Sequence, residues 1–349
     1  MERMTRVLVV DDSAYMRKVI KQMLMRSPFL DVVGTARDGA EALALVEQLR
    51  PDVVTIDLLM PDMDGLAFLR EQMARQPLPV VVVSTSHEAS EQVLRALEAG
   101  AVDVIQKPSA LATEQVFDIS AELIAKVKAA AQVALRQPPS VAPATPPRVQ
   151  PPLVTRTRQN RYDIVVLGIS TGGPQALKQI IPLLPADFPL PLAVVMHMPV
   201  GYTEMYARGL DGMSALHVIE AARGSELRPG TVLIAPAGQH LCLAARGDGS
   251  VIARLDSQPL DSLYRPSVDV LFRSAAQVYR QRVLGLVMTG MGADGRDGAA
   301  WIKAQGGTIW TEEETSCVVY GMPRVVVEAG LSDRQLPLAL VARALQEVI

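Results

Sequence analysis

A glycine-rich run places one serine where a strand is expected to turn into a helix. The run is G-I-S-T-G-G-P at 168–174, with Ser170 at its third position. The β-branched residues at 163–167 predict a buried strand, and the amphipathic pattern at 175–184 predicts a helix that Pro174 opens. The pattern G-x-S-x-G also raises a nucleophilic serine above a sheet in known hydrolases. The same kind of turn can instead cradle a phosphate or carry no chemistry at all.

A serine nucleophile needs a general base within hydrogen-bond reach and usually an acid that orients the base. His197 directly follows the expected strand at 192–196, so it should lie on the rim where Ser170 lies. His240 lies in a second loop near a strand end, and His217 lies inside a strand pattern, which is typical of a pocket or packing residue. Spacing favours His197 as the base and leaves His240 as the alternative.

Asp294 ends a second glycine-rich turn, T-G-M-G-A-D-G at 289–295, which follows an expected buried strand at 283–288. It is a candidate for the orienting acid, and its alternative role is that of a helix N-cap. Backbone N–H groups near Met291 could face a ligand and form an oxyanion hole. The chain order Ser, His, Asp differs from the Ser, Asp, His order of α/β-hydrolases, so we reject that fold.

A second group of reactive side chains lies in the first third of the chain. Asp11 and Asp12 follow the first expected strand, Asp57 ends the third, Ser84 ends the fourth and Lys107 follows the fifth. Clustered carboxylates favour a hard cation such as Mg²⁺. A carboxylate beside a metal and a lysine can accept a phosphoryl group, because the cations neutralise the developing charge. Taken singly, each of these residues could instead cap a helix or be a solvated loop charge.

The elements that must position the first-third residues alternate between strand and helix patterns. Strands are expected at 6–10, 31–35, 53–57, 79–84 and 102–106, and helices at 14–25, 39–49, 66–76, 90–99 and 111–131. Such alternation predicts a parallel, doubly wound sheet of five strands. In that architecture ligands bind at the carboxyl ends of the strands.

The last part of the chain predicts a second and larger α/β domain with a mostly parallel, doubly wound sheet. Strands are expected at 162–167, 192–196, 216–219, 231–235, 251–255, 283–288 and 308–310, and helices at 175–184, 202–210, 267–279, 295–304, 322–329 and 338–348. An antiparallel portion is expected from about 231 to 255.

Between these patterns the chain is rich in proline. Seven prolines lie from Pro138 to Pro152, and five arginines without any acid lie from Arg136 to Arg161. This composition predicts an extended, semi-rigid linker. We therefore expect a first domain at 1–124, a helix end and linker at 125–160, and a second domain at 161–349.

Composition excludes several classes of protein. The 349 residues carry a net charge of −3, which argues against a general nucleic-acid binder. The longest apolar runs are too short to span a membrane, and the N-terminus does not resemble a signal peptide. Cys242 and Cys317 lie far apart without metal-ligand spacing, which predicts ordinary thiols in a reducing cytosol. We expect a cytoplasmic protein.

The first domain resembles the response-regulator receiver family from residue 6 to about 123. The motifs V-V-D-D-S, T-I-D-L-L-M-P-x-M-D-G, V-S-T and Q-K-P carry the resemblance, which implies a flavodoxin-like fold and Asp57 as the phosphoacceptor. It further implies that Asp11, Asp12, Asp57 and the backbone carbonyl of Leu59 hold Mg²⁺, and that Ser84 and Lys107 contact the phosphoryl group. The family often has an aromatic residue three positions before the lysine, whereas this chain has Val104.

Residues from about 161 to 349 are similar to the effector domain of the CheB methylesterase family. The motifs G-x-S-T-G-G, H-M-P, Y-R-P-S-V-D and T-G-M-G-x-D-G carry this resemblance, and the order of receiver, linker and effector domain is that of the family. It implies Ser170 as nucleophile, His197 as general base, Asp294 as orienting acid, the Met291 N–H as oxyanion donor, and Thr171 beside the nucleophile. No cofactor is expected at this site.

Two residues beside the site depart from the family pattern. Ile169 stands where the family commonly has alanine, and Met196 where it commonly has glutamine.

The two resemblances together imply a phosphorylation-controlled serine hydrolase. Its substrates would be methyl-accepting chemotaxis receptors, whose glutamate methyl esters it would hydrolyse to release methanol and whose glutamines it would deamidate. The chemotaxis histidine kinase CheA would be the phosphodonor, and the receiver would cover the catalytic rim until Asp57 is phosphorylated. We expect a monomer that neither inserts into a membrane nor binds nucleic acid. The same chemistry in a non-motility chemosensory array is the alternative.

Two other classes fit the sequence less well. A transcriptional regulator needs a basic helix-turn-helix domain, whereas residues 161–349 hold 16 lysines and arginines against 18 aspartates and glutamates. A nucleotide-binding module would leave His197 and Asp294 without a role, and the chain lacks the P-loop lysine pattern.

Overall fold

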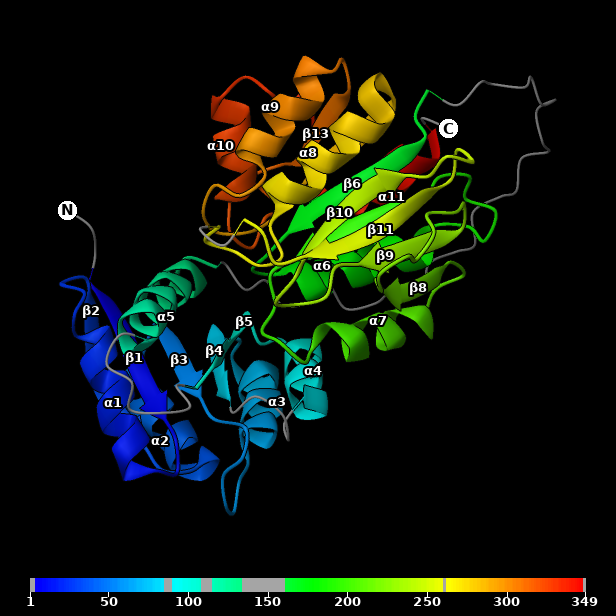
Figure 1. The fold of residues 1–349 in the computed structure, drawn as a ribbon. Helices are drawn as coiled ribbons and strands as arrows, with labels where there is room; N and C mark the ends of the chain where they lie inside the picture. Colours follow the sequence, from blue (N-terminus) through cyan, green and yellow to red (C-terminus); the bar gives the residue numbers. More distant parts are fainter. Residues whose placement is uncertain (1–3, 85–89, 108–114, 134–160, 260–261, 348–349) are drawn as a thin grey trace.

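The computed structural model describes residues 4–84, 90–107, 115–133, 161–259 and 262–347, which form two α/β domains (Figure 1). The helix end that was expected at the start of the 125–160 segment is the last part of helix α5 (Gln115–Ala131). The proline-rich stretch predicted from Pro138 to Pro152 lies outside the described residues.

The first domain is built on a five-stranded parallel sheet with the strand order β2-β1-β3-β4-β5. Its strands are β1 (Thr5–Val10), β2 (Leu30–Ala36), β3 (Val53–Ile56), β4 (Val80–Ser84) and β5 (Asp103–Gln106). The valine-rich strands β3 and β4 are buried along their whole length, as expected for a parallel sheet with helices on both faces.

Helices cover both faces of this sheet. They are α1 (Ala14–Leu24), α2 (Gly39–Leu49), α3 (Gly65–Arg75), α4 (Ser90–Glu98) and α5. Apolar residues of α1 and α5 pack on one face, and those of α2, α3 and α4 pack on the other. Side chains of Ser13, Asp38 and Asp64 accept hydrogen bonds from the first turns of α1, α2 and α3, which satisfies backbone donors there.

The second domain contains a seven-stranded sheet with the order β14-β13-β12-β6-β7-β9-β8, and every pairing in it is parallel. Its strands are β6 (Ile164–Ile169), β7 (Leu192–Met196), β8 (His217–Glu220), β9 (Thr231–Ile234), β12 (Val283–Val287), β13 (Thr308–Glu312) and β14 (Arg334–Leu336). Strand β6 lies between β12 and β7, so the loops that follow these three strands are neighbours on one rim.

The antiparallel portion is smaller than the sequence predicted. It consists of β10 (His240–Ala245) and β11 (Val251–Asp256), which form a two-stranded sheet of their own. Strand β9 was expected to belong to this portion, but it joins the parallel sheet beside β7 because its residues at 232–234 are buried like those of a central strand.

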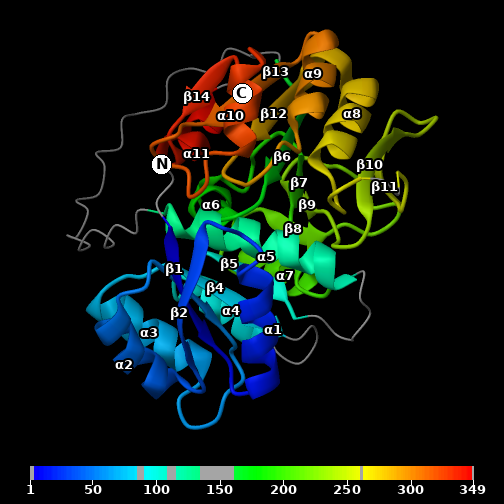
Figure 2. The same cartoon turned by 90° about the vertical axis from the view of Figure 1, so that its left-hand side faces the viewer.

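Helices also cover both faces of the second sheet (Figures 1 and 2). They are α6 (Gly173–Ile180), α7 (Thr203–Asp211), α8 (Val268–Tyr279), α9 (Arg296–Ala304), α10 (Met322–Glu328) and α11 (Leu338–Glu347), with short 3₁₀ turns at Ile181–Leu183 and Arg280–Arg282. Helices α6, α7 and α11 contribute to the core on one face, and α8, α9 and α10 to the core on the other. None of the described helices combines the length and apolarity that a membrane crossing requires.

The two domains pack together through the face of the first domain that carries α4, β5 and α5. Helix α4 contacts both α6 and α7 of the second domain. Figures 1 and 2 show this face of the first domain directed at the second domain. The packing brings the first domain against the loop that contains Ser170.

Candidate functional site

The three residues of the predicted hydrolytic site follow three adjacent strands. Ser170 comes directly after β6, His197 directly after β7, and Asp294 in the loop that follows β12. Backbone hydrogen bonds join the loops, because the Ser170 N–H donates to the carbonyl oxygen of Thr289 (2.9 Å) and the His197 N–H donates to that of Ile169 (3.2 Å). The sheet order therefore brings together residues that are more than 90 positions apart in the chain.

The turn after Ser170 depends on a glycine. Gly172 has φ +81° and forms the N-cap of α6, and a β-carbon at this position would lie 2.6 Å from the side chain of Val318. Both the left-handed backbone and the close approach of Val318 require glycine here.

His197 and Asp294 form a buried pair. The Nε2 of His197 lies 2.8 Å from Oδ2 of Asp294, and its Nδ1 is buried without a hydrogen-bond partner in the described chain. In the serine-protease triad the acid holds Nδ1 and the nucleophile faces Nε2; here the acid holds Nε2. A neutral imidazole bonded to a carboxylate in this way carries its proton on Nε2, which leaves Nδ1 as the proton acceptor. No hydrogen bond joins Ser170 to His197 among the described residues.

Asp294 is held at the start of helix α8. Its carboxylate accepts hydrogen bonds from Ser267 Oγ (2.8 Å), the Val268 N–H (2.7 Å) and the Asp269 N–H (3.0 Å). Burial opposes ionisation of Asp294, but the hydrogen bond and charge of His197 and these backbone donors outweigh burial, so its pKa is lowered. The sequence alternative, an N-cap for the next helix, is wrong because Gly295 occupies that position.

Asp269 holds the start of helix α9 in the same way. Its Oδ1 accepts hydrogen bonds from the N–H groups of Gly295 (2.9 Å) and Gly298 (2.6 Å) at the start of α9. Asp294 therefore caps the helix that contains Asp269, and Asp269 caps the helix that follows Asp294. Burial, together with the neighbouring carboxylates of Asp294 and Asp297, raises the pKa of Asp269 to about 7. Sequence reasoning assigned Asp269 no role, although it lies in the Y-R-P-S-V-D motif at 264–269.

His240 serves as a structural residue beside this pair. It is the first residue of β10, fully buried, and not part of a loop as expected. Its Nδ1 accepts a hydrogen bond from the Ser267 N–H, and its Nε2 lies 3.2 Å from the Pro259 carbonyl oxygen. Both ring nitrogens are bonded, and burial lowers the pKa of His240. The geometry thus leaves His197 as the better candidate for the base.

His217 does not pack in the interior, contrary to the expectation. Its side chain is 64% exposed and contacts Asp211, the last residue of α7. The expectation failed because His217 is the first residue of a strand at the end of the sheet, where one side of the strand has no neighbour.

The loop at 289–295 approaches Ser170 closely. A β-carbon on Gly290 would lie 2.7 Å from Cβ of Ser170, so only glycine fits there. The buried carboxylate of Glu312 accepts a hydrogen bond from the Thr289 N–H (2.9 Å) and fixes the start of the loop. Within the described residues the Met291 N–H donates to no protein acceptor, as an oxyanion donor requires.

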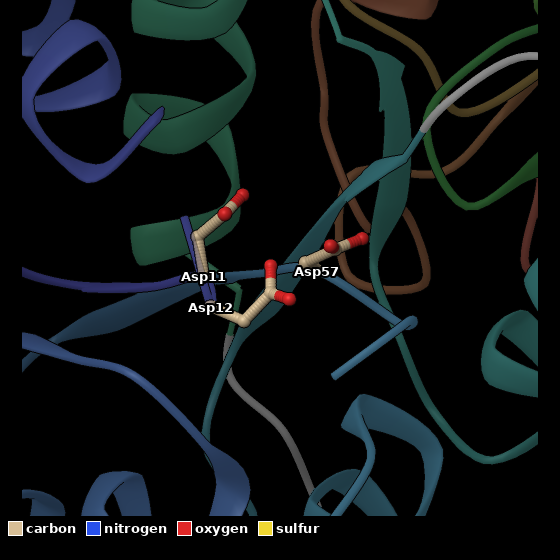
Figure 3. A group of neighbouring side chains, drawn as sticks. All are labelled: Asp11, Asp12 and Asp57. Atoms are coloured by element: carbon tan, nitrogen blue, oxygen red, sulfur yellow. The ribbon is translucent and has the colours of Figure 1, made fainter. Parts of the chain in front are cut away.

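In the first domain, Asp11, Asp12 and Asp57 converge at the carboxyl ends of β1 and β3 (Figure 3). One carboxylate oxygen from each lies within 4.8 Å of the others, and Lys107 Nζ lies 2.7 Å from both Asp11 and Asp57. Burial, and next the charge of Asp11, raise the pKa of Asp57 although Lys107 acts in the opposite direction. One lysine cannot balance three carboxylates, so the residues fit a divalent cation with oxygen ligands.

The other residues predicted for this rim are also in place. Ser84 ends β4 and is fully buried, and Lys107 follows β5. A backbone hydrogen bond from Leu59 helps to lower the pKa of Asp57, so this residue lies at the carboxylate. Burial disfavours the charged form of Lys107, but its two aspartate partners raise its pKa overall. The sheet therefore brings together all the residues that the sequence predicted for a phosphoryl site.

The first domain contacts the residue that follows Ser170. Thr171 Oγ1 donates a hydrogen bond to Asp103 Oδ2 (2.5 Å), whose other oxygen lies 3.1 Å from the buried Lys126 of α5. Nearby, Gln175 of α6 donates to the Leu97 carbonyl oxygen, and Lys178 pairs with Glu98 of α4. These contacts place the α4–β5–α5 face over the rim that carries the hydrolytic residues.

Comparison with known proteins agrees with this two-part arrangement. Residues 165–345 match the CheB methylesterase family, and residues 7–115 match the response regulator receiver domain. A protein-glutamate methylesterase/protein-glutamine glutaminase 5 of Myxococcus xanthus is 52% identical over 334 residues, 95% of this chain and 94% of that protein. The protein-glutamate methylesterase/protein-glutamine glutaminase of Symbiobacterium thermophilum is 46% identical, covering 100% of this chain and 98% of that protein.

A solved structure shares the fold of the second domain. The Thermotoga maritima CheB methylesterase catalytic domain is 44% identical in sequence with a TM-score of 0.53, covering 54% of this chain and 99% of that chain.

The raised pKa of Asp269 predicts a measurable pH dependence of stability. An acid whose pKa is higher in the folded state than its ordinary 3.8 destabilises the fold as pH rises between these values, here from about 4 to about 7. Asp269→Asn keeps an acceptor oxygen but cannot ionise. We expect the free energy of unfolding of the variant, relative to that of the parent, to be higher at pH 8 than at pH 5 by on the order of 1 kcal/mol. Urea unfolding at both pH values measures this, and identical pH dependence in both proteins would contradict it.

Proposed function

The chain belongs to the CheB methylesterase family, and we propose from this membership that it hydrolyses γ-glutamyl methyl esters on chemoreceptors and releases methanol. The full-length relatives carry the name protein-glutamate methylesterase/protein-glutamine glutaminase, so deamidation of receptor glutamines belongs to the same proposal. The receiver domain puts this serine hydrolase under the control of phosphorylation.

The observation that carries the hydrolytic proposal is the state of the His197 imidazole. Asp294 fixes Nε2, and the buried Nδ1 has no hydrogen-bond partner in the described chain. His197 follows β7, which lies beside β6, the strand that Ser170 follows. Nδ1 would accept the proton of Ser170 as its oxygen attacks the ester carbonyl carbon. The resulting imidazolium is stabilised by Asp294, whose three donors at α8 keep it ionised.

The remaining steps follow the double-displacement scheme. The Met291 N–H would stabilise the oxyanion of the tetrahedral intermediate, and Thr171 lies beside the nucleophile. The imidazolium returns its proton to the methoxide oxygen, methanol leaves, and an acyl-enzyme remains. Water then attacks the acyl carbon with the same proton transfers, which frees the glutamate carboxylate and restores Ser170. With a glutamine substrate, ammonia leaves in place of methanol.

At the receiver site, an oxygen of Asp57 would attack the phosphorus of the phosphodonor while the bond between phosphorus and the donor breaks, and the donor would leave with that electron pair. Mg²⁺ held by Asp11, Asp12, Asp57 and the Leu59 carbonyl would supply positive charge toward the transferring phosphoryl group. Ser84 and Lys107 would contact that group.

The partners and location follow from the same family. The chemotaxis histidine kinase CheA would be the phosphodonor, and the enzyme would act as a monomer in the cytoplasm. Before phosphorylation the α4–β5–α5 face would obstruct the receptor helix, and phosphorylation would shift the population toward an open arrangement.

Replacement of the nucleophile is the direct test. Ser170→Ala should lower methanol release from methylated receptor by at least about 10³-fold, because the attacking oxygen is gone. Phosphorylation of Asp57 and the thermal unfolding midpoint should stay as in the parent. Ser250→Ala, in the β10–β11 hairpin, is the matched control and should keep full activity. Activity of Ser170→Ala near that of the parent would rule out the assignment.

Obstruction by the receiver has its own test. Gln175→Ala removes the hydrogen bond to the Leu97 carbonyl, which contributes about 1 kcal/mol to docking, so activity without phosphodonor should rise about fivefold. Activity with phosphodonor and Mg²⁺ should not change. Gln305→Ala, at the end of α9 away from the receiver, is the control. Unphosphorylated Gln175→Ala with parental activity would contradict the obstruction.

A further inference from the structure

The ring of Tyr264 lies flat against the imidazole of His197. The ring centroids are 4.2 Å apart and the planes differ by 8°. Tyr264 begins the 264–269 segment, which also supplies the three hydrogen bonds to Asp294. One short segment therefore contacts both members of the pair.

This stacking restrains the part of His197 that hydrogen bonds leave free. The bond to Asp294 fixes Nε2, but within the described residues no hydrogen bond fixes the Nδ1 edge of the ring. A parallel neighbour keeps the imidazole in one plane, and the face of an aromatic ring attracts the imidazolium that forms during attack. The hydroxyl end of Tyr264 reaches the loop at 289–295, since a β-carbon on Gly292 would lie 2.8 Å from the hydroxyl oxygen of Tyr264.

We propose that Tyr264 is a positioning residue of the esterase, which holds the His197 ring in the plane from which Nδ1 takes the serine proton. The inference rests on the proposed role of His197 as general base. It requires an aromatic ring at position 264 but not the hydroxyl group.

Two substitutions in the full chain, activated with acetyl phosphate and Mg²⁺, separate ring from hydroxyl. Tyr264→Phe should keep kcat within about threefold of the parent, and Tyr264→Leu should lower kcat by about 10- to 100-fold with KM nearly unchanged. Thermal unfolding midpoints establish that both variants are folded. Parental kcat in Tyr264→Leu, or an equal loss in both variants, would overturn the inference.

A third variant keeps this test apart from the proposed function. His197→Asn should lose activity by about 10³-fold. If it stays active, the proposed base is wrong; if it is inactive while Tyr264→Leu has parental kinetics, only the positioning role is wrong.

An independent observation concerns the contact between the domains. Tyr202 precedes α7 in the methylesterase domain, yet it is fully buried in the core of the receiver. It shares that cluster with Val82 and Val104, which face each other on β4 and β5, and Met198 packs against the same cluster. Figure 1 shows α7 lying against α4, the receiver helix of this interface.

The hydroxyl of Tyr202 reaches the phosphoryl site. It is buried, and the ring packs in the cluster that contains Val82, two residues before Ser84 on β4. Burial raises the pKa of Tyr202, and the nearby Ser84 side chain acts in the opposite direction. Ser84 ends β4 on the rim that carries Asp57 and Lys107. A phosphoryl group on Asp57 that binds Ser84 would therefore compete with Tyr202 for this hydroxyl.

We infer that Tyr202 carries the phosphorylation state of Asp57 to the methylesterase domain: its ring docks the receiver, and its hydroxyl senses whether Ser84 is engaged by a phosphoryl group. This inference rests on the proposed phosphorylation control. A ligand and an interface that compete for one group are coupled, so each weakens the other.

Ring and hydroxyl give different expected results in the full chain. Tyr202→Ala should raise activity without phosphodonor about tenfold or more, toward the phosphorylated level, because docking loses its aromatic anchor. Tyr202→Phe should keep the unphosphorylated activity within about twofold but reduce activation by acetyl phosphate and Mg²⁺ by at least about threefold. Tyr206→Phe, one turn further along α7, is the matched control and should keep the parental activation factor.

The outcomes separate the two levels of inference. Parental activation in Tyr202→Phe would overturn the role of the hydroxyl, and parental unphosphorylated activity in Tyr202→Ala would overturn the role of the ring. Failure of acetyl phosphate to activate the parent itself would instead reject phosphorylation control.

Discussion

Asp294 keeps a negative charge in a position that is almost closed to water, and its neighbours are arranged around that charge. Three donors at the start of α8 and the imidazole of His197 compensate it. Removal of such donors would leave a buried charge unpaired, which costs several kcal/mol. Asp269 in turn caps α9, so the loop that carries Asp294 and the helix that holds it are fixed by each other. The orientation of the His197 imidazole depends on this reciprocal pair of caps.

The receiver also buries carboxylates, but there protein groups do not fully compensate their negative charge. There two of the three clustered carboxylates share one buried lysine, and the pKa of Asp57 is raised because burial and the charge of Asp11 exceed the effect of Lys107. A site with uncompensated negative charge favours a divalent cation, whereas the Asp294 site is already compensated by protein donors. Burial therefore accompanies a carboxylate cluster suited to a cation in one domain and a hydrogen-bonded carboxylate–imidazole pair in the other.

The interface joins these two sites through short paths. On one path, Asp103 of β5 bonds Thr171, the residue after the nucleophile. On the other, Tyr202 extends from the methylesterase domain into the receiver core and meets Ser84. Thr171 and Ser84 each lie beside a predicted reacting group, so the contacts between the domains connect the surroundings of Asp57 with the loop that carries Ser170.

Local patterns in the sequence are enough to predict the two α/β domains and the sheet edges at which Ser170, His197, Asp294 and the aspartates of the receiver lie. Hydrophobic period and glycine-rich turns are local signals, and parallel strands put their carboxyl ends at one edge. Only the tertiary structure decided that Asp294 caps α8, that His240 is a buried structural residue, and that Tyr264 and Tyr202 contact His197 and Ser84. The reason is physical: these contacts join segments far apart in the chain, and they depend on strand order and domain packing, which no local pattern encodes.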